Sequence, residues 1–189
     1  MVEAAREPGG AETGAASPDF AALAALGLSL RPSTEEDEAF EQALFASFRA
    51  EELAFVPWPQ PQKDAFLRQQ FGLQHHHFFT HFAGADFWIV ERSLPSGARA
   101  PIGRLYLDRT TPAWHVIDIG FLPEARGQGL GSALLKWAQA SAIEAGRAAI
   151  DLQVAVTNWR AEKLYRALGF QADGNAEGFH CRMVWNAPS

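Results

Sequence analysis

The hydrophobic and polar positions along the chain divide it into a weakly patterned beginning and a regularly patterned body. Residues 1–27 include nine Ala and four Gly and show little apolar periodicity. Such a segment buries too little apolar surface to offset the entropy that is lost on ordering. We therefore expect an Ala/Gly-rich tail over 1–27, loose over 1–18 and with a short helix over 19–26 that could dock on the body. A single domain is expected over 28–189.

Two hydrophobic periods alternate along the body. Apolar and polar residues that alternate between turn residues are typical of strands, and they occur over 28–31, 87–91, 101–108, 113–122, 148–154, 170–172 and 179–185. Apolar residues that recur every three or four positions indicate helices, and they occur over 35–48, 65–82, 129–145 and 158–168. The resulting order, β-α-α-β-β-β-α-β-α-β-β, predicts an α/β (α+β) fold.

Composition narrows the class of protein. With 189 residues, 48% of them hydrophobic and 20% charged, the chain fits one globular domain. Its formal net charge of −6 argues against non-specific binding to nucleic acid or to an anionic membrane. The lone Cys181 cannot form an internal disulfide, and no apolar run approaches the roughly 18 to 20 residues of a membrane helix. We expect a cytoplasmic protein with no nucleic-acid or membrane partner.

A glycine-rich segment, Arg126-Gly-Gln-Gly-Leu-Gly131, lies between a predicted strand and a predicted helix. Backbone N–H groups at a helix N-terminus lack intrahelical partners, so with the helix dipole they attract an anion such as phosphate. The spacing Gly-x-Gly-x-Gly differs from the dinucleotide-binding Gly-x-Gly-x-x-Gly, and no Lys-Ser or Lys-Thr pair follows, as it would in a phosphate-loop ATPase. A different phosphate-bearing ligand and an ordinary glycine turn are the interpretations that remain.

Two motifs together carry a resemblance to a known superfamily. Arg126, Gly129 and Gly131 match the pattern Arg/Gln-x-x-Gly-x-Gly/Ala, and 158–170 match Asn-x-x-Ala-x-x-Leu-Tyr-x-x-x-Gly-Phe. The chain thus resembles the GCN5-related N-acetyltransferase (GNAT) superfamily, in which the first motif is the acetyl-CoA loop and the second lies on a later helix. The resemblance covers 28–185 and is sharpest over 116–170.

The resemblance implies a fold and an activity. The implied fold is a mixed, mostly antiparallel, six- to seven-stranded sheet flanked by about four helices. This sheet splays between its fourth and fifth strands, here 113–122 and 148–154, and the pantetheine arm of coenzyme A would lie in the wedge. The implied activity is direct transfer of an acetyl group from acetyl-CoA to a primary amine of a small molecule or peptide, with a homodimer as the family-level expectation. An acyl-CoA-binding sensor, or a catalytically idle partner protein, is the alternative.

The residues that the resemblance assigns to the cofactor come from both motifs and from the splayed strand. They are Ile119, Phe121, Leu122, Arg126, Gly127, Gln128, Gly129, Leu130, Gly131, Ser132, Asn158, Arg160, Ala161 and Tyr165. Asn158 would also cap its helix, a role that asparagine favours.

Proton transfer requires an acid and a base. The resemblance makes Tyr165 the general acid for the departing thiolate; as an ordinary helix residue it would anchor its hydroxyl elsewhere. Asp118, among apolar strand neighbours, would have its pKa raised by desolvation into a range useful for a general base; as an ordinary residue it would pair with an arginine such as Arg104. His115 is a second candidate base, although strand alternation places it on the opposite face from Asp118. Water is a third.

The acceptor site is the least determined part of the prediction. His77 and His81 are four residues apart, but no Glu or Asp accompanies them to complete a zinc site, so we expect no metal. In the implied fold the first two helices and their loop wall the acceptor site. The candidate substrate residues are therefore Trp58, Gln70, Gln74 and His77.

Charge is unevenly distributed along the chain. Residues 1–52 carry three basic and eleven acidic side chains, whereas 123–170 carry six basic and four acidic ones. The negative charge therefore lies away from the predicted anion-binding loop. If the acidic first helix borders the acceptor site, a cationic amine is the expected acceptor.

Overall fold

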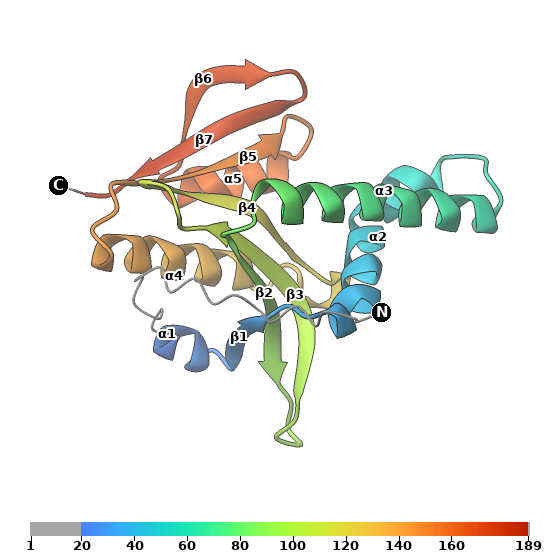
Figure 1. Ribbon diagram of the computed structural model, residues 1–189, viewed down its shortest axis with the longest axis horizontal. Coiled ribbons are helices and arrows are strands. Elements are labelled where there is room, and N and C mark those ends of the chain that lie inside the picture. The colour runs from blue at the N-terminus through green and yellow to red at the C-terminus, as the bar shows by residue number, and fades with distance from the viewer. Residues whose placement is uncertain (1–19, 189) are drawn as a thin grey trace, which may run out of the picture.

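The structure is a computed structural model that describes residues 20–188, apart from the side chains of 175–177. The prediction of a loose tail over 1–18 lies outside the described residues. The elements are shown in Figure 1. They are α1 Ala21–Ala24, β1 Leu28–Pro32, the 3-10 turn η1 Glu35–Asp37, α2 Glu38–Ala54, α3 Gln60–His81, β2 Asp86–Ser93, β3 Arg99–Asp108, β4 Ala113–Phe121, the 3-10 turn η2 Pro123–Ala125, α4 Leu130–Glu144, β5 Ala149–Ala155, α5 Trp159–Ala167, β6 Gln171–Glu177 and β7 His180–Asn186.

The predicted order of strands and helices is confirmed, but several boundaries differ, since α2 continues to Ala54 and β6 to Glu177, beyond the predicted 48 and 172. The helix predicted over 65–82 also begins earlier, at Gln60. Pro61 lies in the first turn of this helix, where the missing N–H of a proline has no intrahelical partner to lose. The proline therefore starts the helix instead of interrupting the chain before it.

Seven strands form one sheet in the order β1-β2-β3-β4-β5-β7-β6. β4 and β5 are parallel, and the other neighbouring pairs are antiparallel. The parallel pair runs from Ala113 opposite Ala149 to Val116 opposite Leu152, and beyond this point β4 continues to Phe121 with only β3 beside it. The predicted mixed sheet with a wedge between its fourth and fifth strands is confirmed.

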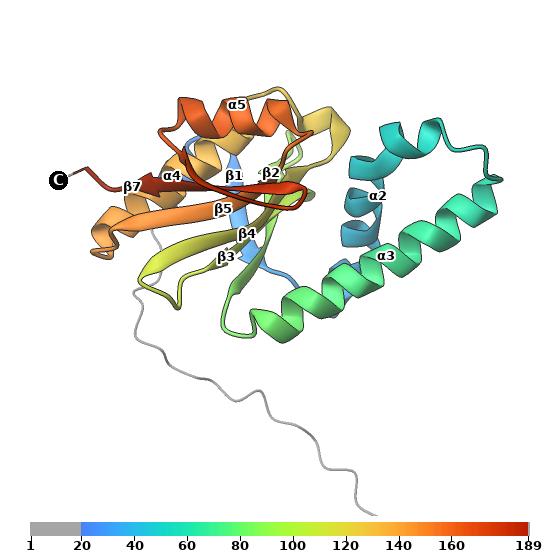
Figure 2. The same ribbon diagram turned by 90° about the horizontal axis from the view of Figure 1, so that it is seen from above.

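Helices cover both faces of the sheet, as Figure 2 shows. On the face of α4 and α5, the fully buried Leu105, Leu134 and Ile150 belong to the main core, which also takes in Leu23 of α1. On the other face, α2 and α3 form an antiparallel arm (Figure 2), in which the rings of Phe45 and Phe71 lie 6.0 Å apart. Within residues 20–188, no helix is both long and apolar enough to cross a membrane.

A β-bulge in β4 changes which side chains share a face. Tyr106 of β3 lies opposite Asp118, but the next residue, Leu107, lies opposite Val116, so Ile117 is the extra residue. An extra residue shifts the alternation of the strand by one position. The prediction that His115 faces away from Asp118 is therefore wrong: His115 stacks on Phe82, at the end of α3, with ring centroids 5.8 Å apart.

Gly120 of β4 is required because α2 packs directly against the strand. A Cβ atom at Gly120 would lie 2.3 Å from the ring of Phe48. We expect Gly120→Ala to lower the free energy of unfolding by about 1–3 kcal/mol through overpacking, measured by urea denaturation. Gly72 of α3 is the matched control, since a Cβ there meets nothing within 4 Å and alanine favours a helix, so Gly72→Ala should stabilise the protein. Equal effects of the two substitutions would contradict this packing.

Candidate functional site

The glycine loop ends in an array of free backbone donors at the N-terminus of α4. Gly127 and Gly129 have φ values of 73° and 77°, and Gly129 is the N-cap of α4 with no side-chain cap. Within the described residues, the six consecutive N–H groups of 127–132 donate no hydrogen bond. Donors of this kind, together with the helix dipole, form an anion site. The left-handed conformation explains why glycine occupies both positions.

Arg126 ties this loop to α2. Its Nε donates to the carbonyl of Phe121 at 2.8 Å, a terminal nitrogen donates to Ser47 Oγ at 2.7 Å, and the guanidinium lies 5.3 Å from the ring centre of Phe48. The predicted cofactor role of Arg126 stays a prediction. Its observed contacts fix the position of the loop.

The second motif lies directly beside the first. Asn158 caps α5 by accepting a hydrogen bond from the N–H of Ala161 at 3.2 Å. A Cβ at Gly131 would lie 3.4 Å from Leu164 Cδ2, so the first turn of α4 approaches α5 closely. Arg160 is exposed and lies over the ring of Trp159. The fold thus brings together two motifs that are separated in sequence by a helix and a strand.

The splayed part of β4 offers backbone groups towards the wedge. The N–H of Leu122 donates to the carbonyl of Ile102 on β3. Because successive strand residues direct their backbone groups to opposite sides, Ile119 and Phe121 direct theirs away from β3. The side chains of both residues pack into the core with α4.

Tyr165 is a buried phenol whose hydroxyl has no hydrogen-bond partner within the described residues. The side chain is 8% exposed, and its ring lies 5.9 Å from that of Phe170. Burial raises the pKa of Tyr165 to about 12, and the negative charge of Asp118 adds to the effect. The hydroxyl therefore stays protonated at neutral pH and is not anchored elsewhere, as an ordinary helix tyrosine would be.

Asp118 forms an ion pair with Arg104, which is the alternative that the sequence left open. Arg104 is 2% exposed, and its Nε and a terminal nitrogen lie 2.6 and 2.5 Å from one oxygen of Asp118. Arg104 also donates to Gln74 Oε1 at 3.1 Å, and its guanidinium lies 4.9 Å from the ring centre of Tyr106. Arg104 thereby connects α3 to the splayed strand.

Sequence reasoning missed a buried carboxylate near this pair, that of Glu41. Glu41 of α2 is 1% exposed and accepts hydrogen bonds from Tyr106 at 2.5 Å and from Ser33 at 2.8 Å. Burial raises the pKa of Tyr106 above its ordinary value, so this phenol remains a donor. The available signals were a glutamate within the apolar stripe of 35–48 and an arginine inside an apolar strand.

The four candidate substrate residues do not form one cluster. Gln74 reaches Arg104, and Gln70 is half-buried one turn earlier on α3. His77 is exposed and its ring lies tilted against that of His81, with centroids 4.2 Å apart. Trp58 precedes α3, and its ring packs on Phe66, which lies about 12 Å before Gln74 along the helix axis. Within residues 20–188, no three His, Cys, Asp or Glu side chains are grouped to hold a metal ion.

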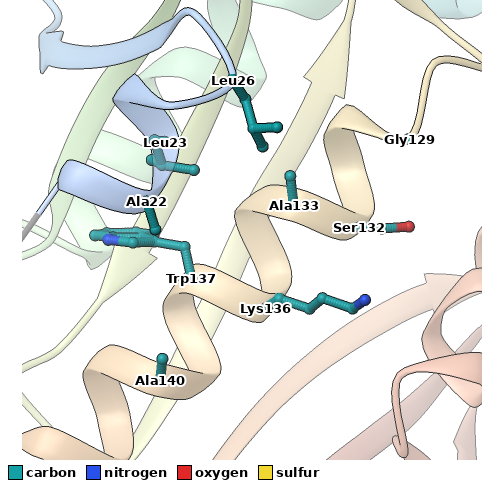
Figure 3. Close-up of a pocket in the computed structure, with 9 residues that line it drawn as sticks. All are labelled: Ala22, Leu23, Leu26, Gly129, Ser132, Ala133, Lys136, Trp137 and Ala140. Atoms are coloured by element: carbon teal, nitrogen blue, oxygen red, sulfur yellow. The ribbon is translucent and has the colours of Figure 1, made fainter.

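A surface hollow of about 410 Å³ lies between α1 and α4. Figure 3 shows Leu23 and Leu26 of the α1 segment facing Ala133 and Trp137 of α4. Gly129 also lines the hollow, whereas Tyr165 and Asp118 do not. The hollow therefore borders the glycine loop without containing the candidate catalytic groups.

The splayed sheet, the glycine loop and the α5 motif define a class of acyltransferases. The model of the acetyltransferase (GNAT) family matches residues 40–170, which is more than half of the chain and includes both motifs. The chain therefore belongs to the GCN5-related N-acetyltransferase family.

One relative in sequence and two solved structures are similar to this chain. The thialysine N-epsilon-acetyltransferase of Bos taurus is 45% identical over 64 residues, which cover 34% of this chain and only 38% of that relative. The PaiA N-acetyltransferase of Thermoplasma acidophilum, solved with coenzyme A, has a TM-score of 0.62 at 15% identity over 84% of this chain and 98% of that one. The spermidine N-acetyltransferase of Vibrio cholerae, solved with CoA and spermine, has a TM-score of 0.56 at 21% identity over 86% and 96%. At these identities the solved structures show the fold alone.

Proposed function

We propose that the protein transfers an acetyl group from acetyl-CoA directly to a primary amine. The observation that carries the proposal is the protonated hydroxyl of Tyr165, which has no hydrogen-bond partner within the described residues and feels the charge of Asp118 on the splayed strand. Direct transfer needs a proton for the departing thiolate, and a phenol whose pKa is about 12 holds its proton until that moment.

The residues on both sides of the wedge fit the cofactor. The six free N–H groups of 127–132 would hold the pyrophosphate, and the backbone of Ile119 would bind the pantetheine amides. When bound, acetyl-CoA supplies an activated thioester. The chain would orient this thioester and donate hydrogen bonds to it. Tyr165 would then give a proton to the departing sulfur.

A small cationic amine is the acceptor that we favour. The Bos taurus and Vibrio cholerae relatives act on thialysine and spermidine according to their names, and the first 52 residues of this chain carry eleven acidic side chains. Asp118 and Gln74 lie on the α3 face of the sheet, where such an acceptor would approach the wedge.

The test is thiol release from acetyl-CoA over a panel of polyamines, amino acids, aminoglycosides and peptides. Release with cationic amines, and less with neutral or anionic ones, supports the proposal. Calorimetry that shows tight acetyl-CoA binding, combined with no release for any amine, would favour an acyl-CoA-binding sensor instead. The absence of acetyl-CoA binding would overturn both.

The glycine loop gives a second prediction. A valine at position 129 must adopt the left-handed conformation or reshape the loop, at a cost of about 1–2 kcal/mol. We therefore expect Gly129→Val to weaken acetyl-CoA binding about tenfold in calorimetry. Gly146, at the other end of α4, has a φ of 66° and equally open surroundings, so Gly146→Val is a matched control for backbone strain. Equal loss of affinity in both variants would contradict a role of the loop in binding.

A further inference from the structure

The bulge at Ile117 puts a second titratable group of β4 on the face where the acceptor would approach. Asp118 lies opposite Tyr106 and His115 lies opposite Asp108, so both side chains are on the α3 side of the sheet. His115 is at the rung of the β4–β5 ladder just before the last one, Val116 with Leu152. Its side chain is 26% exposed. The imidazole therefore lies where the strands begin to separate and remains open to solvent.

A carboxylate of β5 fixes the orientation of this imidazole. His115 Nδ1 lies 2.5 Å from Asp151 Oδ1, while the other oxygen of Asp151 accepts from Arg182 Nε at 3.0 Å. Burial raises the pKa of Asp151, but the hydrogen bonds from His115 and Arg182 outweigh it and hold the pKa below its usual range. Asp151 is thus ionised and can only accept. The hydrogen of a neutral His115 must be on Nδ1.

This tautomer leaves a lone pair on Nε2. Within the described residues, Nε2 of His115 has no hydrogen-bond partner. A neutral imidazole with Nδ1–H bonded to a carboxylate and Nε2 open is the arrangement in which histidine accepts a proton from a substrate.

Asp118 is less suited to the same task. Its oxygen is held twice by Arg104, which is 2% exposed. Protonation of Asp118 during catalysis would remove the ion-pair partner of a buried guanidinium, which is unfavourable. His115 has no such buried cation depending on it, since Arg182 is 45% exposed.

We propose that His115 Nε2 is the general base of the acetyl transfer, with Asp151 as its positioning residue. This inference rests on the proposed function. His115 takes one proton from the acceptor ammonium, directly or through one water, and the freed lone pair forms the bond from nitrogen to the acetyl carbon. The carbon–sulfur bond breaks with its electron pair on sulfur, which Tyr165 protonates. The second proton lost from nitrogen restores the Tyr165 hydroxyl, and His115 releases its proton to solvent.

The test compares His115→Gln with His180→Gln, the same change at an exposed histidine of β7. We expect His115→Gln to lower kcat about 100-fold, with acetyl-CoA affinity changed less than about twofold, and His180→Gln to change neither. The loss of kcat in His115→Gln should become smaller from ethylamine to its monofluorinated and then its difluorinated analogue. Fluorine makes the amine less basic, so a larger fraction is already neutral and less of it needs a base. Asp151→Asn should lower kcat about tenfold with the same dependence on amine basicity.

Other outcomes would overturn the inference. If His115→Gln keeps at least half of the wild-type kcat, or if its deficit is the same for all amines, His115 is not the base. If instead Asp118→Asn lowers kcat, and lowers it more for the more basic amines, Asp118 is the base. Absence of turnover in the unmodified protein would refute the proposed function, and nitrogen NMR of the histidine rings then tests the inference separately. It should show protonated Nδ1 and bare Nε2 at His115, and the opposite tautomer would overturn the proposal.

Discussion

Replacing Tyr165 by phenylalanine is expected to lower kcat for acetyl transfer about 100-fold while acetyl-CoA affinity changes less than about twofold. Loss of a positioned general acid costs a factor of this size, and the ring, which makes the packing contact with Phe170 at 5.9 Å, is retained. Steady-state thiol release gives kcat, and calorimetry gives the affinity. Loss of affinity in proportion to kcat would show that the hydroxyl binds the cofactor and does not donate a proton.

The chain offers a matched control, because it contains only one other tyrosine, Tyr106. Tyr106→Phe removes a hydrogen bond to the buried Glu41, so it should lower the free energy of unfolding by about 1–3 kcal/mol. The wild type should also keep its activity up to pH 10 as far as this acid is concerned, because the pKa of Tyr165 is raised to about 12 and the protonated form is the active one.

The second large effect is on stability. Asp118→Ala should lower the free energy of unfolding by about 3 kcal/mol, because it leaves the guanidinium of Arg104, 2% exposed, without its partner. Arg104→Met should cost less, since the side chain of Asp118 is 24% exposed and can turn to water. Urea denaturation of the two single variants and the double variant measures the coupling between them.

The double variant decides between two explanations of the Asp118 effect. If the cost is the uncompensated charge, adding Arg104→Met to Asp118→Ala should restore part of the stability. If the double variant is as unstable as the sum of the two single changes, the residues act independently and the ion pair carries no special weight.

Some parts of the site could be predicted because their signals are local. The glycine loop and the α5 motif are each continuous in sequence. Any helix that starts at Leu130 leaves its first backbone N–H groups without intrahelical partners. The asparagine cap at 158 follows equally from the preference of this residue for helix starts. The same local reasoning placed the strands on either side of the wedge.

Other parts could not be predicted because they depend on contacts between distant segments. Gln74 reaches Arg104 across 30 positions of the chain, and Tyr106 reaches Glu41 across 65. The three other candidate substrate residues were chosen by the same reasoning as Gln74, yet Trp58 lies at the far end of α3. Helical periodicity gives the face of a residue but not its distance from the sheet.

By itself, the sequence determined the order of the elements, the glycine loop before α4 and the position of Tyr165 on α5, because hydrophobic period, helix capping and glycine spacing act over a few residues. Only the tertiary structure decided the partners of the charged groups and the face of His115. The bulge at Ile117 arises from how β4 pairs with β3. The apolar alternation of β4 changes phase between Val116 and Ile117, but this pattern alone does not say which residue the partner strand leaves unpaired. Because one extra residue reverses the alternation of a strand, this single irregularity brings His115 to the face of Asp118 and, as we propose, to the acceptor.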